Sequence, residues 1–389
     1  MKKVLFVATV VKTHIMEFHI PYLKMFKEMG WETAVAAKND YEVPEDCVIP
    51  YCDTYYNIQF ERNPMALGNI KAYKCLKKVI DEGEYDIIHC HTPVGAMMTR
   101  LAAKQARKKG TKRKKGTKRK KGTKVLYTAH GFHFFKGASA VNWLVYYPVE
   151  KWLSRYTDVL ITINKEDYAR AQTFKAGKVC YVPGVGIDLK RFSVGHVNRN
   201  EKLSEMGVDS KDFVLLSVGE LIPRKNHEVV LRAIARLKQS KHYERLSYVI
   251  CGRGTYEPEL KRLADELGIA EHVHFLGYRS DIAEICNCCD LFVFMSHQEG
   301  LPVALMEAMA CGIPVLCSNI RGNTDLIENN VSGLIADNTP EGVEKAIMYM
   351  LENDKLREQM AEEAMKHIKK FDLVQVEQQM YKIYQEVLA

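Results

Sequence analysis

The sequence predicts an α/β fold made of two halves, each a parallel sheet wrapped by helices. Short apolar runs alternate with helical stretches along the chain, and this rhythm restarts near residue 190. The composition agrees, because 389 residues with 47% hydrophobic side chains suffice for two or three domains with well-filled cores. We therefore expect a globular protein with two α/β domains.

Six apolar runs in the first half have the length and residue types of strands. They are KVLFVAT from Lys3, ETAVAA from Glu32, YDIIHC from Tyr85, KVLYTA from Lys124, TDVLITI from Thr157 and KVCYVP from Lys178. The start of the chain, MKKVLFVATVVKTH, has the lysines and the uncharged stretch of a signal peptide, but no small-x-small cleavage site follows. We interpret it as a first buried strand and expect a cytoplasmic protein.

Five further apolar runs form the second half. They are FVLLSVG from Phe213, LSYVICG from Leu246, HVHFLG from His272, DLFVFM from Asp290 and IPVLCS from Ile313. The last stretch of the chain predicts a helix with one apolar face, formed by Leu373, Val376, Met380, Ile383 and Val387. Ligands of doubly wound sheets lie beyond the carboxyl ends of the strands, so we expect a site in the cleft between the two sheets.

The hexapeptide RKKGTK occurs three times in succession over residues 107–124. The repeats hold twelve Lys and Arg and no acid, so the formal charge of +8 becomes −4 without them. They lie in a helix-to-strand connection, far from the expected site. A solvated loop produced by tandem expansion is favoured over adhesion to an anionic membrane surface. Nucleic-acid recognition is disfavoured, because the repeats contain no aromatic residue for base stacking.

The eleven cysteines show no paired spacing, which favours a reducing compartment. The one C-x-x-C, Cys286 to Cys289, has no second pair with which to bind zinc and adjoins the apolar run LFVFM. We expect buried thiols there. No apolar run approaches the roughly 18 residues of a membrane span.

The stretch HQEGLPVALMEAMACGIPVLCS places two carboxylates around a turn and a helix start. Pro302 suits the first helical position, because it lacks the N–H that would be unpaired there. The positive end of this helix is a candidate anion site, and a diphosphate is the expected ligand. Its free N–H groups would be those of Leu301, Val303 and Ala304. Glu299 could then bind a sugar and Glu307 a ribose; the alternative is an amphipathic helix with a partly exposed Glu.

A second motif, SVGELIPRKNHEVVLRAI, is a strand, a glycine turn and a helix start with Arg224 and Lys225 at its mouth. Two cations there could neutralise the same diphosphate, each charge-assisted contact contributing about 1.5–3 kcal/mol. Alone, such a pair is more often a solvated surface pair. Its presence in the same half as the Glu-Gly-Leu-Pro turn favours the phosphate-binding role.

The chain resembles glycosyltransferases of family 4, and the similarity covers nearly its whole length. The matching pieces are VGxxxxRKNH, the stretch from HFLGYRSD to GIPVLCS, and the hinge-like VPGVGIDLKRF. The resemblance implies the GT-B fold, two facing Rossmann-like domains with parallel sheets and a cleft between them. It implies an acceptor-binding domain over 1–190 with the basic repeat loop 107–124, a nucleotide-sugar domain over 191–370, and a final helix, 371–389, packed on the first domain.

The stretches TAHGFHFFKG and HIMEFHIPYLKMFKEMGWE resemble the branch that extends undecaprenyl-diphosphate-linked sugars for bacterial capsule, exopolysaccharide or glycoprotein assembly. The implied activity is that of a retaining hexosyltransferase. It would move a hexose or N-acetylhexosamine from a UDP-sugar to a lipid-diphosphate-linked saccharide. The implied location is the cytoplasm, with peripheral contact to the inner membrane and no nucleic-acid partner.

The resemblance also assigns roles to individual residues. His130 and Glu299 become the catalytic candidates, His130 near the transferred sugar and Glu299 on the donor sugar. Donor-binding candidates are Gly219, Arg224, Lys225, Gly277, Tyr278, Arg279, Gly300, Leu301, Pro302, Val303, Ala304 and Glu307. His14 and His19 are candidates for an acceptor phosphate, with a structural role equally open.

Two stretches depart from the family pattern. Many relatives have an Arg directly after the Gly of SVG, where this chain has Glu220, so Arg224 would have to replace that phosphate clamp. Many also have a Gly-Gly loop after the first strand, where this chain has TVVKTHIMEFH.

No D-x-D occurs in the chain, so a Mg²⁺ or Mn²⁺ clamp is unsupported. We expect no metal and no cofactor, and the helix dipole with Arg224 and Lys225 must stabilise the leaving diphosphate.

The stretch from Phe132 to Tyr156 is rich in aromatic residues, which suits either membrane contact or ordinary packing. Two other functions stay open. One is a sugar-nucleotide epimerase or hydrolase of the same fold, and the other is a membrane adaptor that acts through the basic repeats.

Overall fold

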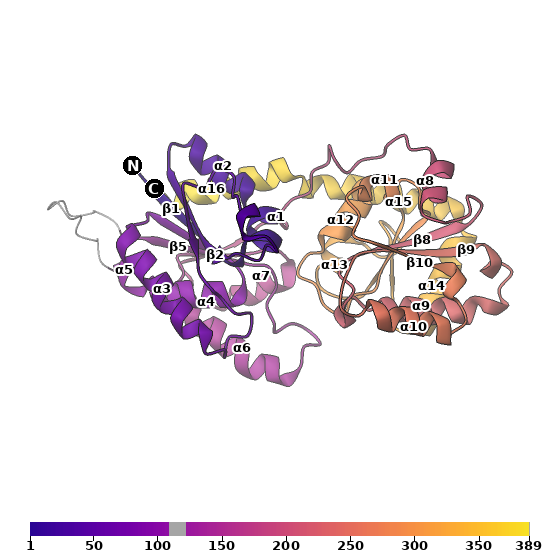
Figure 1. Ribbon diagram of the computed structural model, residues 1–389, viewed down its shortest axis with the longest axis horizontal. Helices are drawn as coiled ribbons and strands as arrows, with labels where there is room; N and C mark the ends of the chain where they lie inside the picture. Colours follow the sequence, from indigo (N-terminus) through magenta and orange to yellow (C-terminus); the bar gives the residue numbers. More distant parts are fainter. Residues whose placement is uncertain (109–121, 389) are drawn as a thin grey trace. The chain divides into compact units, whose positions relative to one another are not determined.

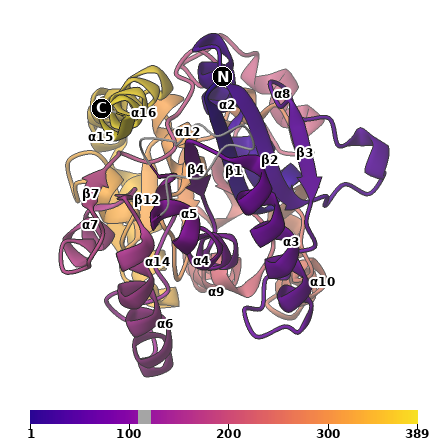
Figure 2. The ribbon, with the colours of Figure 1, turned by 90° about the vertical axis from the view of Figure 1, so that its left-hand side faces the viewer.

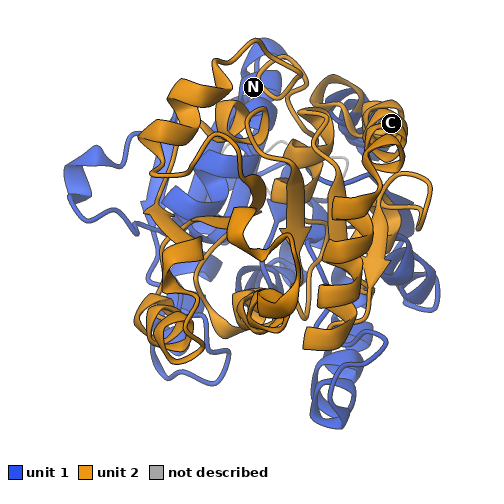
Figure 3. Ribbon diagram, turned by 90° about the vertical axis from the view of Figure 1, so that its right-hand side faces the viewer, with its two compact units in different colours: residues 1–185, 376–389 blue, residues 186–375 orange. Residues whose placement is uncertain are grey.

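The computed structural model describes residues 1–108 and 122–388. Two compact units make up the chain: Met1–Val185 with Val376–Ala389, and Gly186–Gln375 (Figure 3). These divisions lie a few residues from the boundaries expected near 190 and 370. Most of the basic repeat segment, residues 109–121, lies outside the described residues, so the loop expected there stays a prediction.

Unit 1, which is Met1–Val185 with Val376–Ala389, is built on a parallel sheet of seven strands in the order β3-β2-β1-β4-β5-β6-β7 (Figures 1 and 2). The strands are β1 (Lys3–Val10), β2 (Glu32–Lys38), β3 (Thr54–Asn57), β4 (Ile87–Cys90), β5 (Lys124–Ala129), β6 (Val159–Thr162) and β7 (Lys178–Tyr181). The order reverses direction between β1 and β4. Such a reversal is the usual ligand-binding point of a doubly wound sheet.

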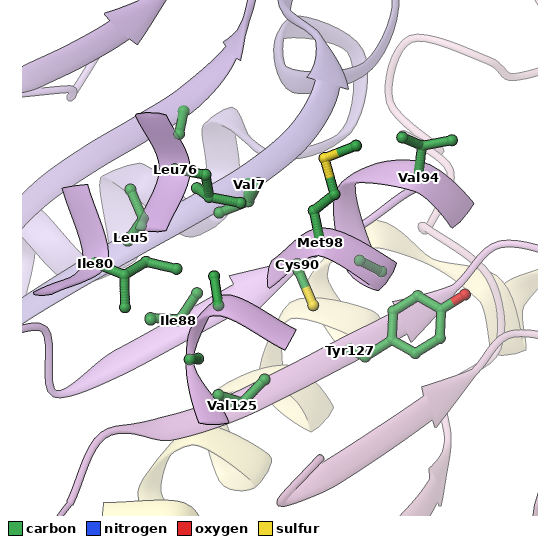
Figure 4. Close-up of a cluster of buried hydrophobic side chains, with 14 of the residues drawn as sticks. Leu5, Val7, Leu76, Ile80, Ile88, Cys90, Val94, Met98, Val125 and Tyr127 are labelled. Atoms are coloured by element: carbon green, nitrogen blue, oxygen red, sulfur yellow. The ribbon is translucent and has the colours of Figure 1, made fainter. Parts of the chain in front are cut away.

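Helices cover both faces of this sheet. They are α1 (Met16–Phe18), α2 (Ile20–Glu28), α3 (Gly68–Gly83), α4 (Pro93–Ala102), α5 (Lys104–Lys108), α6 (Ala140–Leu153), α7 (Lys165–Ala171) and α16 (Leu373–Leu388), with a π-helical turn η1 (Val11–Ile15) after β1. Because successive residues of a strand point to opposite faces, each strand feeds two cores. Leu5 and Val7 join one with α3 and α4 (Figure 4), whereas Phe6 joins the other with α2 and α16.

Helix α16 completes the second of these cores. Its apolar stripe, expected from the sequence, buries Val376, Met380 and Ile383. Tyr384, also buried, stacks edge-on against Phe26 of α2 with ring centroids 4.7 Å apart. The last helix therefore belongs to the hydrophobic core of unit 1.

Unit 2, which is Gly186–Gln375, has a parallel sheet of six strands in the order β10-β9-β8-β11-β12-β13. The strands are β8 (Phe213–Val218), β9 (Leu246–Cys251), β10 (Val273–Gly277), β11 (Leu291–Phe294), β12 (Val315–Ser318) and β13 (Leu334–Ala336). The helices are α8 (Arg199–Glu205), α9 (His227–Arg236), α10 (Glu257–Glu266), α11 (Ile282–Cys286), α12 (Val303–Ala310), α13 (Asn323–Leu326), α14 (Pro340–Glu352) and α15 (Asp354–Ile368). The strand order reverses between β8 and β11.

The predicted α/β class with two parallel sheets is confirmed, and all eleven predicted strands are present. The structure adds β3 and β13, which are edge strands of the two sheets. The first strand, β1, is buried in the middle of its sheet, as expected. Among the described residues, no helix is both long enough and apolar enough to cross a membrane.

Candidate functional site

In unit 2, the candidate phosphate-binding cations and Glu299 lie at the point where the strand order reverses. Arg224 and Lys225 follow β8 in a short 3-10 turn, η4 (Pro223–Lys225), and Glu299 follows the neighbouring strand β11. The carboxyl ends of parallel strands meet at one edge of a sheet. Glu299 therefore lies beside Lys225 and Arg224, although it follows them by 74 and 75 positions in the sequence. The backbone joins the two loops as well, since the His297 N–H donates to the Arg224 carbonyl at 2.9 Å.

The carboxylate of Glu299 binds both cations. Its Oε1 lies 2.8 Å from Lys225 Nζ and 3.0 Å from Arg224 Nη1. The side chains of Glu299 and Lys225 are 11% and 14% exposed, so this ion pair is largely shielded from solvent. Arg224, at 40%, reaches the surface and also donates to the Gln298 carbonyl at 2.7 Å. The sequence motifs thus converge on one charged cluster with a partly exposed cation.

The helix after Glu299 begins one residue later than predicted. Pro302 is not the first helical residue but the N-cap of α12, with φ −77° and ψ 118°. The extended ψ ends the turn before the helix, and proline offers no side chain to cap it. Four other helices, by contrast, begin with a side-chain cap, from Ser139, Asn164, Asn198 and Thr339. The first N–H groups of α12, those of Val303 and Ala304 among them, therefore lack a side-chain acceptor at the cap.

The turn that carries Glu299 rests on residues that the sequence analysis missed. The Arg321 Nε donates to the Glu299 carbonyl at 3.0 Å. Gly322, with φ +82°, lies against the turn so closely that a Cβ there would be 2.6 Å from the Gly300 carbonyl oxygen. Both residues follow β12, the strand beside β11, so parallel pairing was the available signal.

The remaining donor candidates lie around this cluster or at the sheet edge. Gly219 lies at the end of β8, where an added Cβ would be 3.5 Å from the Lys225 side chain. Glu307 is half-buried on α12, close enough to Cys286 to help raise the pKa of that thiol. Glu220, at the family's usual clamp position, is exposed.

Gly277 is the last residue of the edge strand β10, and Tyr278 and Arg279 follow it, so these candidates do not lie at the ends of β8 or β11. Arg279 binds Asp281 and Glu205, and its guanidinium holds the pKa of Asp281 far below its usual range. Tyr278 is 71% exposed. An exposed ring beside a glycine with φ +64° is available for contact with a base.

In unit 1, histidines gather where β1, β4 and β5 end. His14 lies in η1 and His19 just before α2, whereas His91 and His130 directly follow β4 and β5. One nitrogen from each of the four rings lies within 4.8 Å of the others. Burial lowers the pKa of His130 to about 4, and it lowers those of the other three well below their usual value. All four rings are therefore neutral at pH 7.

Sequence reasoning selected His14, His19 and His130 but missed His91. The HTP directly after the strand YDIIHC was the available signal, because it places His91 at the carboxyl end of β4. His89, two residues earlier, has other partners. Its Nδ1 is 2.8 Å from the Tyr384 hydroxyl and its Nε2 is 2.8 Å from the Thr128 hydroxyl.

A larger cavity of about 380 Å³ opens beside this cluster in unit 1. Both apolar and polar side chains line it, with His14, Arg62, His133 and Tyr146 among the polar ones. Thr92, also in its wall, has φ +60°, a rare backbone conformation for a β-branched residue. Its hydroxyl oxygen accepts from the Thr9 N–H at 3.1 Å, which fixes the loop after β4 against β1. His19 does not line this cavity, being only 1% exposed.

Helix α6 lines the same cavity and exposes an apolar face. Its aromatic residues Trp143, Tyr146 and Tyr147 pack on the core of unit 1, so packing explains most of the aromatic stretch. The residues left exposed are Val141, Leu144, Val145, Val149 and Trp152, at 39–76%. Glu150 is withdrawn from the surface in a bidentate pair with Arg100, at 2.8 and 2.9 Å.

Comparison with known proteins identifies the family. The family model "Glycosyl transferase 4-like" matches residues 3–164, and "Glycosyl transferases group 1" matches residues 198–367. The chain is 40% identical to "Putative glycosyltransferase EpsD" of Bacillus subtilis (strain 168), over 98% of this chain and 96% of that protein. It is 28% identical to the Escherichia coli UDP-Gal:alpha-D-GlcNAc-diphosphoundecaprenol alpha-1,3-galactosyltransferase, over 71% of this chain and 68% of that protein.

A solved structure supports the fold. The crystal structure of Anabaena Alr3699/HepE in complex with UDP and glucose aligns with a TM-score of 0.79 at 20% identity, covering 99% of this chain and 100% of that one. The sequence comparisons and the fold therefore indicate the same family. The chain belongs to the glycosyltransferases with the GT-B fold, as a member with a 4-like N-terminal half and a group 1 C-terminal half.

Proposed function

We propose that the protein is a retaining hexosyltransferase that moves a sugar from a UDP-sugar to a lipid-diphosphate-linked saccharide in bacterial surface polysaccharide synthesis. The observation that carries this proposal is the cluster of Arg224, Lys225 and Glu299 beside the start of α12. Two cations and an uncapped helix start at one sheet edge suit a diphosphate. The name of the Escherichia coli relative includes a diphosphoundecaprenol-linked sugar, and this supports the proposed class of acceptor.

In this proposal the donor diphosphate binds the cations and the N–H groups around residues 300–304. Glu299 binds the donor sugar, Glu307 the ribose, and the loop from Gly277 to Arg279 the base. As the bond to the sugar breaks, negative charge grows on the departing phosphate oxygen. Preorganised cations and N–H dipoles stabilise that charge without Mg²⁺ or Mn²⁺. The acceptor hydroxyl attacks the face that the diphosphate leaves, and we assign His130 to the transferred sugar.

We assign the acceptor to the cavity of about 380 Å³ in unit 1. A wall that combines apolar side chains with polar ones suits a saccharide attached to a lipid. The exposed apolar face of α6 borders the cavity and carries no exposed carboxylate, which supports peripheral contact with the cytoplasmic face of a membrane.

Nucleotide screening by thermal shift tests the donor. UDP at a hundred times its dissociation constant should stabilise the protein by about 2.7 kcal/mol, and GDP and ADP should stabilise it less. Incubation with UDP-sugar alone should release no free sugar and no changed sugar nucleotide. Transfer should require a lipid-diphosphate saccharide analogue, and adding Mg²⁺ or Mn²⁺ should leave its rate unchanged. Free sugar without an acceptor would support the hydrolase or epimerase instead.

Vesicle flotation tests the membrane face. Leu144→Glu should weaken binding to vesicles that contain anionic lipid, because it puts a charge at the most exposed apolar position of α6. Val48→Glu is the matched control, since Val48 is 71% exposed elsewhere in unit 1. Equal binding by both variants would remove α6 from the proposal.

A further inference from the structure

The four imidazoles of His14, His19, His91 and His130 form a built site in unit 1. They come from three separate chain segments that the parallel sheet brings together at the ends of β1, β4 and β5. It is the one group of potential metal ligands of this kind found among the residues that the structure describes. Three of the rings are at least nine-tenths buried, and His130 is half-buried.

Four nitrogens of this cluster are buried without a hydrogen-bond partner, whereas His130 Nε2 and His91 Nδ1 are within hydrogen-bond distance of each other. The four are His14 Nε2, both nitrogens of His19 and His91 Nε2. A buried polar atom without a partner is energetically costly, so several in one place call for a bound group. The adjacent His89 shows the alternative, because hydroxyl groups satisfy both of its nitrogens.

The separations between the rings suit one shared ion. His130 Nε2 and His91 Nδ1 are 3.4 Å apart. That is about the separation of two nitrogens that each lie about 2.0–2.1 Å from a tetrahedral ion. The ring centroid of His14 is 4.9 Å from that of His130, 5.0 Å from that of His19 and 5.9 Å from that of His91. His19 and His91, by contrast, stack with centroids only 3.7 Å apart.

This stacking limits the ligand set to three rings. Two rings that lie face to face this closely do not both point at one ion in a regular tetrahedron, so one of the pair supports the other. His14 and His130 lie outside this stacked pair. A cavity of about 20 Å³ lies against His19, His91 and His130 but not against His14, and Tyr22, His89 and Thr128 also line it. It has room for one ion or one water molecule.

We propose that this cluster binds one divalent transition-metal ion of the Zn²⁺ class through His14, His130 and one of the stacked pair His19 and His91. Imidazole ligands select Zn²⁺, Co²⁺, Ni²⁺ or Cu²⁺ over Mg²⁺ and Mn²⁺. A set of three neutral rings leaves the fourth position for a small anionic oxygen ligand such as hydroxide, which offsets part of the charge of the buried ion. The ion would also fix the orientation of His130, the cluster residue that reaches the surface.

The inference goes beyond the proposed function, and metal content tests it without a transfer assay. Purified full-length protein, stripped with a chelator and dialysed against Zn²⁺, should retain about one ion per chain. Replacement by Co²⁺ should give the intense visible absorption of a four-coordinate ion. His14→Ala and His130→Ala should each abolish retention, and so should exactly one of His19→Ala and His91→Ala.

His133→Ala is the matched control, because His133 is nearby but stacks on Tyr146 outside the cluster. Circular dichroism and the melting temperature show whether each variant folds. If a variant does not fold, the wild-type Co²⁺ spectrum still decides. A wild-type protein without stoichiometric metal, or retention that survives both His14→Ala and His130→Ala, would overturn the proposal. Loss of metal with donor binding intact would leave the proposed function standing.

Discussion

At the scale of single residues, the unit 2 cluster shows two cations held side by side by one carboxylate. Glu299 binds Lys225 and Arg224 and so keeps like charges together at a strand end. Lys225 also lies 5.0 Å from the centre of the Phe294 ring, which further limits its freedom. The side chains of Arg224 and Lys225 are already ordered before a diphosphate binds, and this lowers the entropic cost of binding.

Lys225→Ala and Glu307→Ala should each lower the transfer rate about 30-fold or more. This corresponds to the loss of roughly 2 kcal/mol for one charged contact in the transition state. Initial rates with a lipid-linked acceptor analogue provide the measurement. Lys261→Ala, which alters an exposed pair with Glu257 on α10, is the matched control. Near-normal turnover by both site variants would remove the proposed donor site.

His227, the first residue of α9, should make unit 2 less stable in mild acid. Burial, helped by the charge of Lys225, lowers its pKa to about 4. In the unfolded chain the ring has a pKa of about 6.5, so between pH 6.5 and 4 the unfolded state binds the proton first. The contribution of His227 is therefore complete above pH 6.5 and is lost as the pH falls towards 4, by up to about 3 kcal/mol.

Urea unfolding of wild type and His227→Gln at pH 7.5 and pH 4.5 checks this. The variant should be the less stable protein at pH 7.5, and the difference should shrink at pH 4.5. His196→Gln, at an exposed position, controls for the substitution itself. A difference that stays constant with pH would contradict the assignment.

Sequence reasoning found the residues that belong to recognisable motifs. Arg224 and Lys225 were predicted to bind a diphosphate and Glu299 the sugar attached to it; the structure brings the three side chains together, and their roles stay a prediction. Arg321 was missed because nothing in its local sequence distinguishes it from a loop residue, and His91 was missed although it directly follows the predicted strand YDIIHC. Their role arises from strand pairing, which places the ends of β12 and β4 beside those of β11 and β1.

At the scale of elements, α16 shows how an amphipathic stripe finds its partner. The spacing predicted the buried face, and the core against α2 accounts for it. The stripe did not reveal Tyr384, a fully buried residue that packs on Phe26 and hydrogen-bonds His89. Tyr is common on exposed helix faces as well, so its burial depends on the tertiary partner.

Tyr384→Ala should destabilise unit 1 by about 3–5 kcal/mol, because it leaves a cavity and removes a hydroxyl partner from His89. Tyr381→Ala on the same helix should change the free energy of unfolding by less than about 0.5 kcal/mol, since Tyr381 is 42% exposed. Denaturant unfolding of both variants compares them directly. Similar losses would mean that α16 is held by something other than this core.

The eleven predicted strands and the two missed ones differ in a physical way. Central parallel strands are buried on both faces and read as continuous apolar runs. Strand β3 has the sequence TYYN with no fully buried residue, and β13 has only three residues. Both are edge strands, where half of the backbone pairing is absent. The edge strands β7 and β10 were nevertheless predicted, so the short length of β13 and the polar-ended TYYN of β3, rather than edge position alone, hid the two missed strands.

At the scale of the whole molecule, the ends of the basic repeat segment are close together. The Thr123 N–H donates to the Ala106 carbonyl at 3.2 Å, and Arg107 pairs with Asp158 at 2.9 Å. Gly122 passes so near Arg107 that a Cβ would lie 2.2 Å from its carbonyl oxygen. The described ends therefore need an Arg at the start and a Gly-Thr at the end, which a single hexapeptide supplies.

Deleting residues 113–124 should leave transfer to a soluble acceptor analogue close to the wild-type rate. Because the repeats are identical, the remaining copy keeps the Arg and the Gly-Thr-Lys that the flanking helix and β5 require. Flotation with anionic vesicles, run in parallel, measures any contribution of the lost charges to membrane binding. Loss of intrinsic transfer would indicate that the repeats act in the reaction itself.

The return of α16 to unit 1 affects how the protein matures on the ribosome. The first 185 residues leave the exit tunnel long before Val376–Ala389, so the surface around Tyr22 and Phe26 stays uncovered while unit 2 is being translated. A chain that is stalled or cleaved before α16 would expose this apolar surface to chaperones and proteases. The core of unit 1 is therefore filled only after α16 has been translated.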